Sequence, residues 1–145
     1  MFYFDLCFEK IIMNPSIEGG AKYVNNPKDP GGETKYGIAK RSHPTINIAE
    51  LSESDAKAIY IREYWDPLSL SDAPYTWALV TFDCAVNQGV GTARILRETS
   101  PTIPVFMAKR ALKYAREPQE QLQQFGLGWM TRLFLVMQMA STPSP

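Results

Sequence analysis

A short glycine-rich stretch near the start of the chain holds the residues best suited to acid–base chemistry. Glu18 is followed by Gly19 and Gly20, whose backbone can adopt positive φ and approach a ligand closely. A second carboxylate, Asp29, comes next in a Pro-Gly turn, and the hydroxyl of Thr34 follows that turn. Glycoside hydrolysis needs one carboxyl group that donates a proton and polar groups opposite it that hold water or stabilise positive charge. The stretch therefore indicates a glycan-cleaving site with Glu18 as its acid.

Each of these residues also has a simpler structural interpretation. Glu18 can be a surface residue at a helix end, Asp29 a turn former that bonds its own backbone, and Thr34 an ordinary strand residue. The adjacent Gly-Gly pair and the nearby Asp and Thr favour the functional interpretation for Glu18. For Asp29 and Thr34 both interpretations stay open.

The same stretch resembles glycoside hydrolase family 108, the phage and bacterial N-acetylmuramidases of the lysozyme-like superfamily. The family pattern is Glu-Gly-Gly-Tyr, then Asn-x-Pro-x-Asp-x-Gly-Gly, then Thr-x-Tyr-Gly-Ile. The matching residues are Glu18, Gly19, Gly20, Tyr23, Asn25, Pro27, Asp29, Gly31, Gly32, Thr34, Tyr36, Gly37 and Ile38. Later matches are Tyr64-Trp65, the run from Asp83 to Gly89, Gly128-Trp129 and Arg132. The chain departs from the pattern at Ala21 and Lys22, which separate Gly20 from Tyr23 and lengthen the Glu-to-Asp spacing.

The resemblance implies a lysozyme that cleaves the β-1,4 bond between N-acetylmuramic acid and N-acetylglucosamine in peptidoglycan. Glu18 would protonate the leaving oxygen, Asp29 would orient water or stabilise the oxocarbenium ion, and Thr34 would help hold that water. The residues expected to bind substrate are Tyr23, Tyr36, Tyr64 and Asn87. The implied partners are glycan strands and, in a phage context, tail or virion proteins. The role of such a protein would be host lysis or penetration of the cell wall at entry.

Length and composition are those of one soluble globular domain. The 145 residues include 45% hydrophobic and 21% charged residues, which is ordinary for a chain that buries a core. Acidic and basic residues balance, so the composition does not favour nucleic-acid binding.

Cysteine and histidine are too few for redox or metal chemistry. Cys7 and Cys84 lie in apolar sequence and are expected to pack as small hydrophobic side chains, not in a disulfide framework. They and His43 do not make a zinc site without carboxylates. We therefore expect no metal and no cofactor, and we expect His43 to be an exposed loop residue.

Export signals are missing from the sequence. The apolar N-terminus lacks a basic start and is interrupted by Asp5, Glu9 and Lys10, so it does not resemble a signal peptide. No segment is long and apolar enough to span a bilayer. A phage muramidase of this sequence would be made in the host cytoplasm and act in the periplasm or cell wall, or be carried in the virion.

Helical periodicity and turn residues predict a mainly α fold of about six or seven helices. Residues 21–38 are the only β-like part and are expected to form one hairpin lobe, with a cleft between it and a helical bundle. Ser52 and Thr92 are the expected N-caps of two helices. Together with the resemblance, this gives an α+β lysozyme-like fold, with one domain over 1–140 and a disordered tail at 141–145.

Polar residues on the helices give further expectations. Asp83 and Asn87 lie one turn apart on the most apolar helix and must be paired, with the loop of Glu18 or the hairpin as the expected partners. Gly126 and Gly128 predict a bend or break in the last helix. A solvated face, or contact with anionic wall polymer or phospholipid, is expected for Lys109, Arg110, Lys113 and Arg116.

Two other functions stay open. The first is a catalytically inactive, lysozyme-derived structural or glycan-binding component of a phage virion, which the inserted Ala21 and Lys22 would suit. The second is a peptidoglycan enzyme with different chemistry, such as an amidase. That enzyme would need a metal cluster or a Cys-His nucleophile, and the single histidine argues against it.

Overall fold

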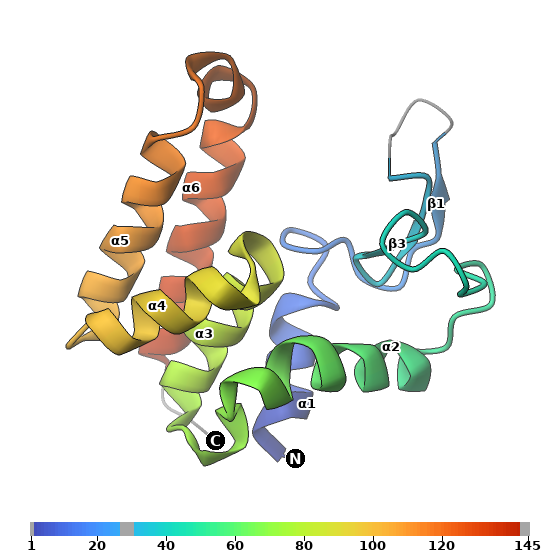
Figure 1. Cartoon of the computed structure of the whole chain (residues 1–145), viewed down its shortest axis with the longest axis horizontal. Coiled ribbons are helices and arrows are strands. Elements are labelled where there is room, and N and C mark those ends of the chain that lie inside the picture. Colours follow the sequence, from blue (N-terminus) through green and yellow to red (C-terminus); the bar gives the residue numbers. More distant parts are fainter. Residues whose placement is uncertain (1, 27–30, 143–145) are drawn as a thin grey trace. The chain divides into compact units, whose positions relative to one another are not determined.

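The computed structural model describes residues 2–26 and 31–142. The chain divides into two compact units, Met1–Glu63 and Tyr64–Pro145, which Figure 1 colours from blue to green and from green to red. The regular structure of the described residues comprises six α-helices, short 3₁₀ and π turns, and one small antiparallel sheet. This composition confirms the predicted mainly α fold.

The first unit contains two helices, α1 (Phe2–Ile11) and α2 (Glu53–Tyr60). One face of α1 is apolar and buried, because Phe4, Phe8, Ile11 and Ile12 recur at helical spacing and are almost fully enclosed. Phe8 packs edge-on against Tyr60 of α2, with the ring centroids 5.8 Å apart. The predicted capping box at the start of α2 is present, since the Ser52 hydroxyl accepts from the amide of Asp55 at 3.1 Å.

The sheet of the first unit has three strands, where the sequence predicted a single hairpin. Its strands are β1 (Val24–Asn25), β2 (Glu33–Lys35) and β3 (Ile38–Ala39), in that order. Thr34 sits opposite both Val24 and Ala39. The chain turns again between β2 and β3, where Tyr36 and Gly37 both adopt positive φ, 54° and 73°. Two successive residues of this kind make a tight hairpin turn.

His43 also differs from expectation. Its side chain is only 15% exposed, and its Nε2 lies 3.0 Å from Oε2 of Glu63. Burial alone would raise the pKa of Glu63, but the hydrogen bonds from Arg62 and His43 outweigh it and the pKa is lowered. His43 therefore contributes to the fold of the first unit as a hydrogen-bond partner of Glu63.

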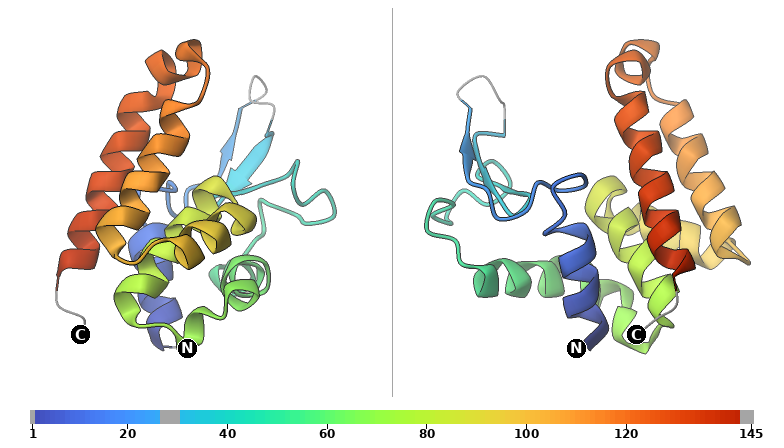
Figure 2. Two further views of the ribbon diagram at one scale, coloured as in Figure 1. Left: turned by 60° about the vertical axis from the view of Figure 1, so that its left-hand side comes forward. Right: turned by 180° about the vertical axis from the view of Figure 1, so that it is seen from behind.

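The second unit is a helical bundle around α3 (Tyr75–Gln88). A π turn, η1 (Ile61–Trp65), crosses the boundary between the units, and two 3₁₀ turns follow, η2 (Asp66–Leu68) and η3 (Leu70–Asp72). The remaining helices are α4 (Val90–Thr99), α5 (Ile103–Ala115) and α6 (Gln119–Ser141). All three contact α3, and α5 and α6 lie side by side in both views of Figure 2. The segment from Ala78 to Ala85 of α3 is fully buried, as its apolar sequence predicted.

A buried ionic cluster joins α3 to the last two helices. Asp83 is fully buried, and its Oδ2 accepts a 2.7 Å hydrogen bond from Nη1 of Arg110 while its Oδ1 accepts a 2.9 Å bond from Nε of Arg132. Gln88 accepts from Nε of Arg110 at 2.9 Å. The prediction of a solvated Arg110 is therefore wrong, because a buried carboxylate on the neighbouring helix supplies the partner that an enclosed guanidinium needs.

Two further local predictions are corrected by the second unit. Thr92 does not cap α4, because the helix already begins at Val90 with Gly89 as its N-cap. Gly126 and Gly128 do not break the last helix, since α6 runs unbroken from Gln119 to Ser141. The predicted disordered tail thus overlaps the end of α6 at Ser141, and residues 143–145 lie outside the described residues.

The two cysteines are buried and unpaired with each other, as expected of small hydrophobic side chains. Burial raises the pKa of Cys7 to about 12 and that of Cys84 to about 11, so neither is a ready nucleophile. Within residues 2–26 and 31–142, no cluster of three or more His, Cys, Asp or Glu side chains could hold a metal ion. No helix in the same residues is long and apolar enough to cross a membrane.

Candidate active site

Glu18 is presented by a tight loop directly after α1. The carbonyl of Asn14 accepts from the amides of Ile17, Glu18 and Gly19 at 3.0, 3.1 and 3.3 Å. Gly20 then closes the loop by donating to the carbonyl of Ile12 at 3.1 Å. These backbone bonds fix the main chain of Glu18 independently of any ligand.

The two glycines after Glu18 are required by this loop. Gly19 and Gly20 have φ of 85° and 69°, a region that side chains disfavour. A Cβ on Gly20 would also lie 3.1 Å from the carbonyl oxygen of Met13. These two glycines therefore allow the loop to pass close to the end of α1. The Glu18 side chain that the loop presents is half-buried.

The Glu18 carboxylate lies against the turn between β2 and β3. A Cβ added to Gly37 would sit 3.0 Å from Oε2 of Glu18 and 2.8 Å from the hydroxyl of Tyr60, so both groups converge on the bare backbone of Gly37. The Tyr60 hydroxyl donates to the carbonyl of Tyr36 at 2.8 Å, and the amide of Tyr36 donates to the carbonyl of Gly20 at 3.1 Å. Loop, turn and α2 are thus tied together where the acid is held.

Gly37 provides a test of this packing. We expect Gly37→Ala to lower both the melting temperature and the rate of glycan cleavage per folded molecule, because the new Cβ displaces Glu18 or Tyr60 and φ is 73°. Gly89→Ala is the matched control, since Gly89 has φ of 93° but nothing within 4 Å of its added Cβ. Thermal unfolding and initial rates measure both variants. Equal rate losses in the two would contradict a specific role for Gly37 beside Glu18.

The other two predicted catalytic residues are Thr34, which the structure describes, and Asp29, which it does not. Thr34 lies in the middle strand, is half-buried, and its hydroxyl donates a long 3.5 Å hydrogen bond to the carbonyl of Gly32. Asp29 lies outside the described residues. The separation of the two carboxyl groups, Glu18 and Asp29, therefore stays a prediction, and so does a water held by Thr34.

The predicted substrate-binding tyrosines of the first unit differ in exposure. Tyr23 is 39% exposed just before β1, and partial burial with the neighbouring carboxylate of Glu33 raises its pKa. Tyr36 is 8% exposed, and the Nζ of Lys35 lies 5.5 Å from the centre of its ring. Tyr23 is therefore the more exposed of the two side chains, and contact of either ring with a sugar stays a prediction.

Tyr64 and Asn87, the remaining predicted binding residues, belong to the second unit. Tyr64 is half-buried within η1. Asn87 accepts a hydrogen bond from the hydroxyl of Tyr114, whose ring stacks on Trp129 with the centroids 4.9 Å apart. The prediction that Asp83 and Asn87 are both paired is confirmed, and these partners come from α5 and α6. Proximity of Asn87 to Glu18 stays a prediction.

Two residues that hold the acid were not expected from the sequence. Tyr60 is one of several tyrosines in the chain, and the burial of its hydroxyl gives no sequence signal. Gly37 was noted as a pattern match, with no stated reason for a glycine. The contact between these residues and Glu18 depends on segments that are far apart in the chain.

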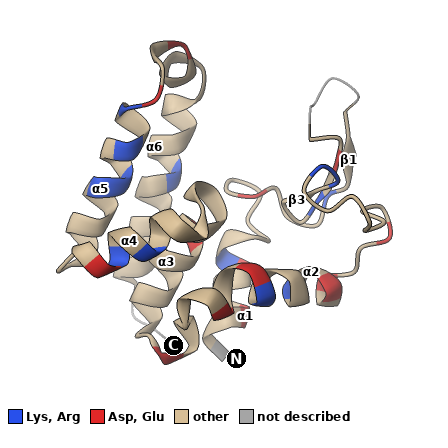
Figure 3. Ribbon diagram, in the orientation of Figure 1, with Lys and Arg blue, Asp and Glu red and all other residues tan. Residues whose placement is uncertain are grey.

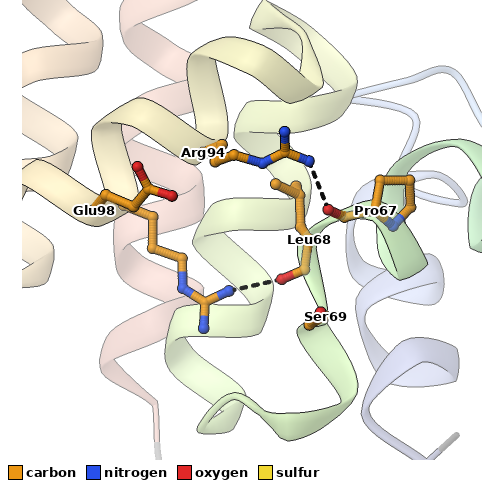
Figure 4. Close-up of a pocket in the computed structure, with 6 residues that line it drawn as sticks. Pro67, Leu68, Ser69, Arg94 and Glu98 are labelled. Carbon is orange, nitrogen blue, oxygen red and sulfur yellow. Dashed lines mark hydrogen bonds between the residues drawn. The ribbon is translucent and has the colours of Figure 1, made fainter.

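Figure 4 shows a hollow in the second unit whose arginine side chains bond to the protein's own backbone. It is lined by Pro67, Leu68, Ser69, Arg94, Arg97 and Glu98. Arg94 donates to the carbonyl of Pro67 at 2.8 Å, and Arg97 donates to that of Leu68 at 3.0 Å. Both guanidinium groups of α4 thus satisfy carbonyls at the end of η2, and they hold this turn against the helix.

Known proteins are similar to this chain over the segment that carries Glu18. The family model for glycosyl hydrolase 108 matches residues 11–89, which include every predicted site residue. The solved structure of Brucella abortus SagA is similar with a TM-score of 0.71, at 22% sequence identity, over 96% of this chain and 91% of that chain. At this identity the likeness shows a shared fold. No curated protein matches the sequence.

Proposed function

Because the chain belongs to glycosyl hydrolase family 108, whose members are glycosidases that act on peptidoglycan, we propose that it is a lysozyme. In this proposal it cleaves the β-1,4 bond between N-acetylmuramic acid and N-acetylglucosamine. The observation that carries the proposal is the half-buried carboxyl group of Glu18, fixed by the Asn14 loop and held against Gly37 within the matched segment.

The reaction follows from the position of this carboxyl group. Glu18 donates its proton to the glycosidic oxygen as the bond to the leaving sugar breaks. Asp29 orients the attacking water or stabilises the oxocarbenium ion, and the Thr34 hydroxyl helps hold that water. The exposed ring of Tyr23 offers an apolar surface on which a sugar ring can stack.

The biological setting that we propose is phage lysis or penetration of the wall at entry. The protein would be made in the host cytoplasm and act in the periplasm or cell wall, or be carried in the virion beside tail proteins. This setting follows from the resemblance of the Glu18 to Ile38 pattern to phage muramidases.

A virion component that binds glycan without cutting it is the second candidate, and the inserted Ala21 and Lys22 favour it. Incubating the full chain with purified, insoluble peptidoglycan separates the two candidates. A lysozyme releases soluble fragments and new reducing ends in proportion to time. Protein that sediments with the glycan and releases nothing would reject the lysozyme proposal.

The role of Asp29 has its own test. We expect Asp29→Ala to lower the cleavage rate, but less than a change at Glu18, because water can still reach the sugar without this carboxylate. Deleting Ala21 and Lys22 is the companion variant, since it restores the family spacing between Glu18 and Asp29. Initial rates and melting temperatures are measured for both. An unchanged rate with a lower melting temperature in Asp29→Ala would assign Asp29 to the turn.

A further inference from the structure

A groove between α4 and α5 combines positive charge with exposed aliphatic side chains. It has a volume of about 500 Å³ and lies wholly within the second unit. Its lining residues are Thr92, Ile95, Leu96, Thr99, Lys109, Leu112, Lys113 and Arg116. None of them is acidic, although acidic and basic residues balance over the whole chain.

Among the described residues, the ion pairs inside the second unit do not neutralise the basic residues that line this groove. No acidic residue occurs from Thr99 to Arg116, while four basic residues do, and blue bands mark basic residues along α5 in Figure 3. Arg110 is neutralised by Asp83 inside the bundle. Of the three that line the groove, Lys109 donates to Thr99, whereas the structure gives no ion pair for Lys113 or Arg116 among the described residues.

The aliphatic side chains restrict what this groove can bind. Ile95 on α4 is 61% exposed and Leu112 on α5 is 57% exposed, and both line the groove beside the basic residues. A soluble phosphate polymer would engage Lys113 and Arg116 but would leave both aliphatic side chains in water. An anionic bilayer satisfies both features, because its headgroups attract basic side chains and its interface accepts apolar ones.

We propose that this α4–α5 groove docks on the surface of an anionic phospholipid membrane. Lys113 and Arg116 contact headgroup phosphates, and Ile95 and Leu112 enter the boundary between headgroups and acyl chains. The protein rests on the surface, with most of each helix outside the bilayer. This inference goes beyond glycan cleavage and does not depend on it.

Vesicle sedimentation with the full chain tests the proposal. We expect binding to vesicles containing phosphatidylglycerol, weak binding to pure phosphatidylcholine, and loss of binding at high salt. Lys113→Gln with Arg116→Gln should lower the partition coefficient about twenty-five-fold, because each basic residue near an anionic surface contributes about fivefold. Lys22→Gln with Arg41→Gln removes equal charge from exposed positions of the first unit and should change it little.

Leu112→Ser and Ile95→Ser test the aliphatic contribution and should each weaken vesicle binding while the melting temperature is kept. Equal binding to both kinds of vesicle, or equal losses in the groove and control variants, would overturn the proposal. So would binding of soluble polyglycerol phosphate as tightly as vesicles with no effect of Leu112→Ser, because that result would identify a site for phosphate polymers.

Discussion

Replacing Glu18 with glutamine is expected to lower the rate of peptidoglycan cleavage by about a hundredfold to ten-thousandfold. Glutamine has nearly the same shape, so the packing against Gly37 and the backbone bonds to Asn14 are kept. What it removes is the proton that the leaving oxygen must receive. The measurement is the initial rate of reducing-end release, with thermal unfolding to show that the fold is intact.

Glu9→Gln is the matched control for this experiment, since Glu9 is an exposed carboxylate in the same unit. It should leave the rate within about twofold of the unaltered protein, as expected for a surface residue away from the site. Near-full activity of Glu18→Gln would remove Glu18 from the mechanism. A loss shared by both variants would point to an effect of charge on binding to the wall.

The second large effect is expected at Asp83. Asp83→Asn removes the charge that two buried guanidinium groups share, at 2.7 Å from Nη1 of Arg110 and 2.8 Å from Nη2 of Arg132. Breaking a buried ion pair by removing one partner costs about 3–5 kcal/mol. The free energy of unfolding should fall by that amount, as measured by denaturant titration.

Asp72→Asn serves as the control for Asp83, because Asp72 is an exposed acidic residue of the same unit. Its free energy of unfolding should stay within about 0.5 kcal/mol of the unaltered value. A similarly small change in Asp83→Asn would show that the cluster contributes little to stability. The cleavage rate per folded molecule of Asp83→Asn should stay unchanged although its stability falls, since the role assigned to Asp83 is structural.

The elements that the sequence predicted well are those set by local patterns. The Ser52 capping box and the buried helix α3 each depend on spacings within one segment. The errors come from partners far apart in the chain. Arg110 looks solvated until Asp83, on another helix, provides a buried partner for it.

Tertiary packing also overrides local preference in α6. Gly126 and Gly128 each cost a helix about 1 kcal/mol relative to alanine. The helix nonetheless continues through both, because it packs on α3 and α5 and its Arg132 binds Asp83. Propensity within a short window does not include these contacts.

The candidate site likewise contains residues that local patterns predict and residues that depend on long-range contacts. Glu18 could be predicted because its Gly-Gly neighbours and the pattern that follows are close in sequence. Tyr60 could not, because its hydroxyl reaches the turn at Tyr36 only after α2 has folded beside the sheet. The turn at Tyr36 and Gly37 was missed because tyrosine favours strands and is rare at positive φ.

The most direct test of the central claim is to identify the sugar at each new chain end. Purified peptidoglycan is digested with the full chain, reduced with borohydride and hydrolysed. The resulting sugar alcohols are separated and identified by mass spectrometry. The account predicts reduced N-acetylmuramic acid at the new ends, and almost none in a digest with Glu18→Gln. Reduced N-acetylglucosamine, ends that borohydride cannot reduce, or no new ends at all would contradict it.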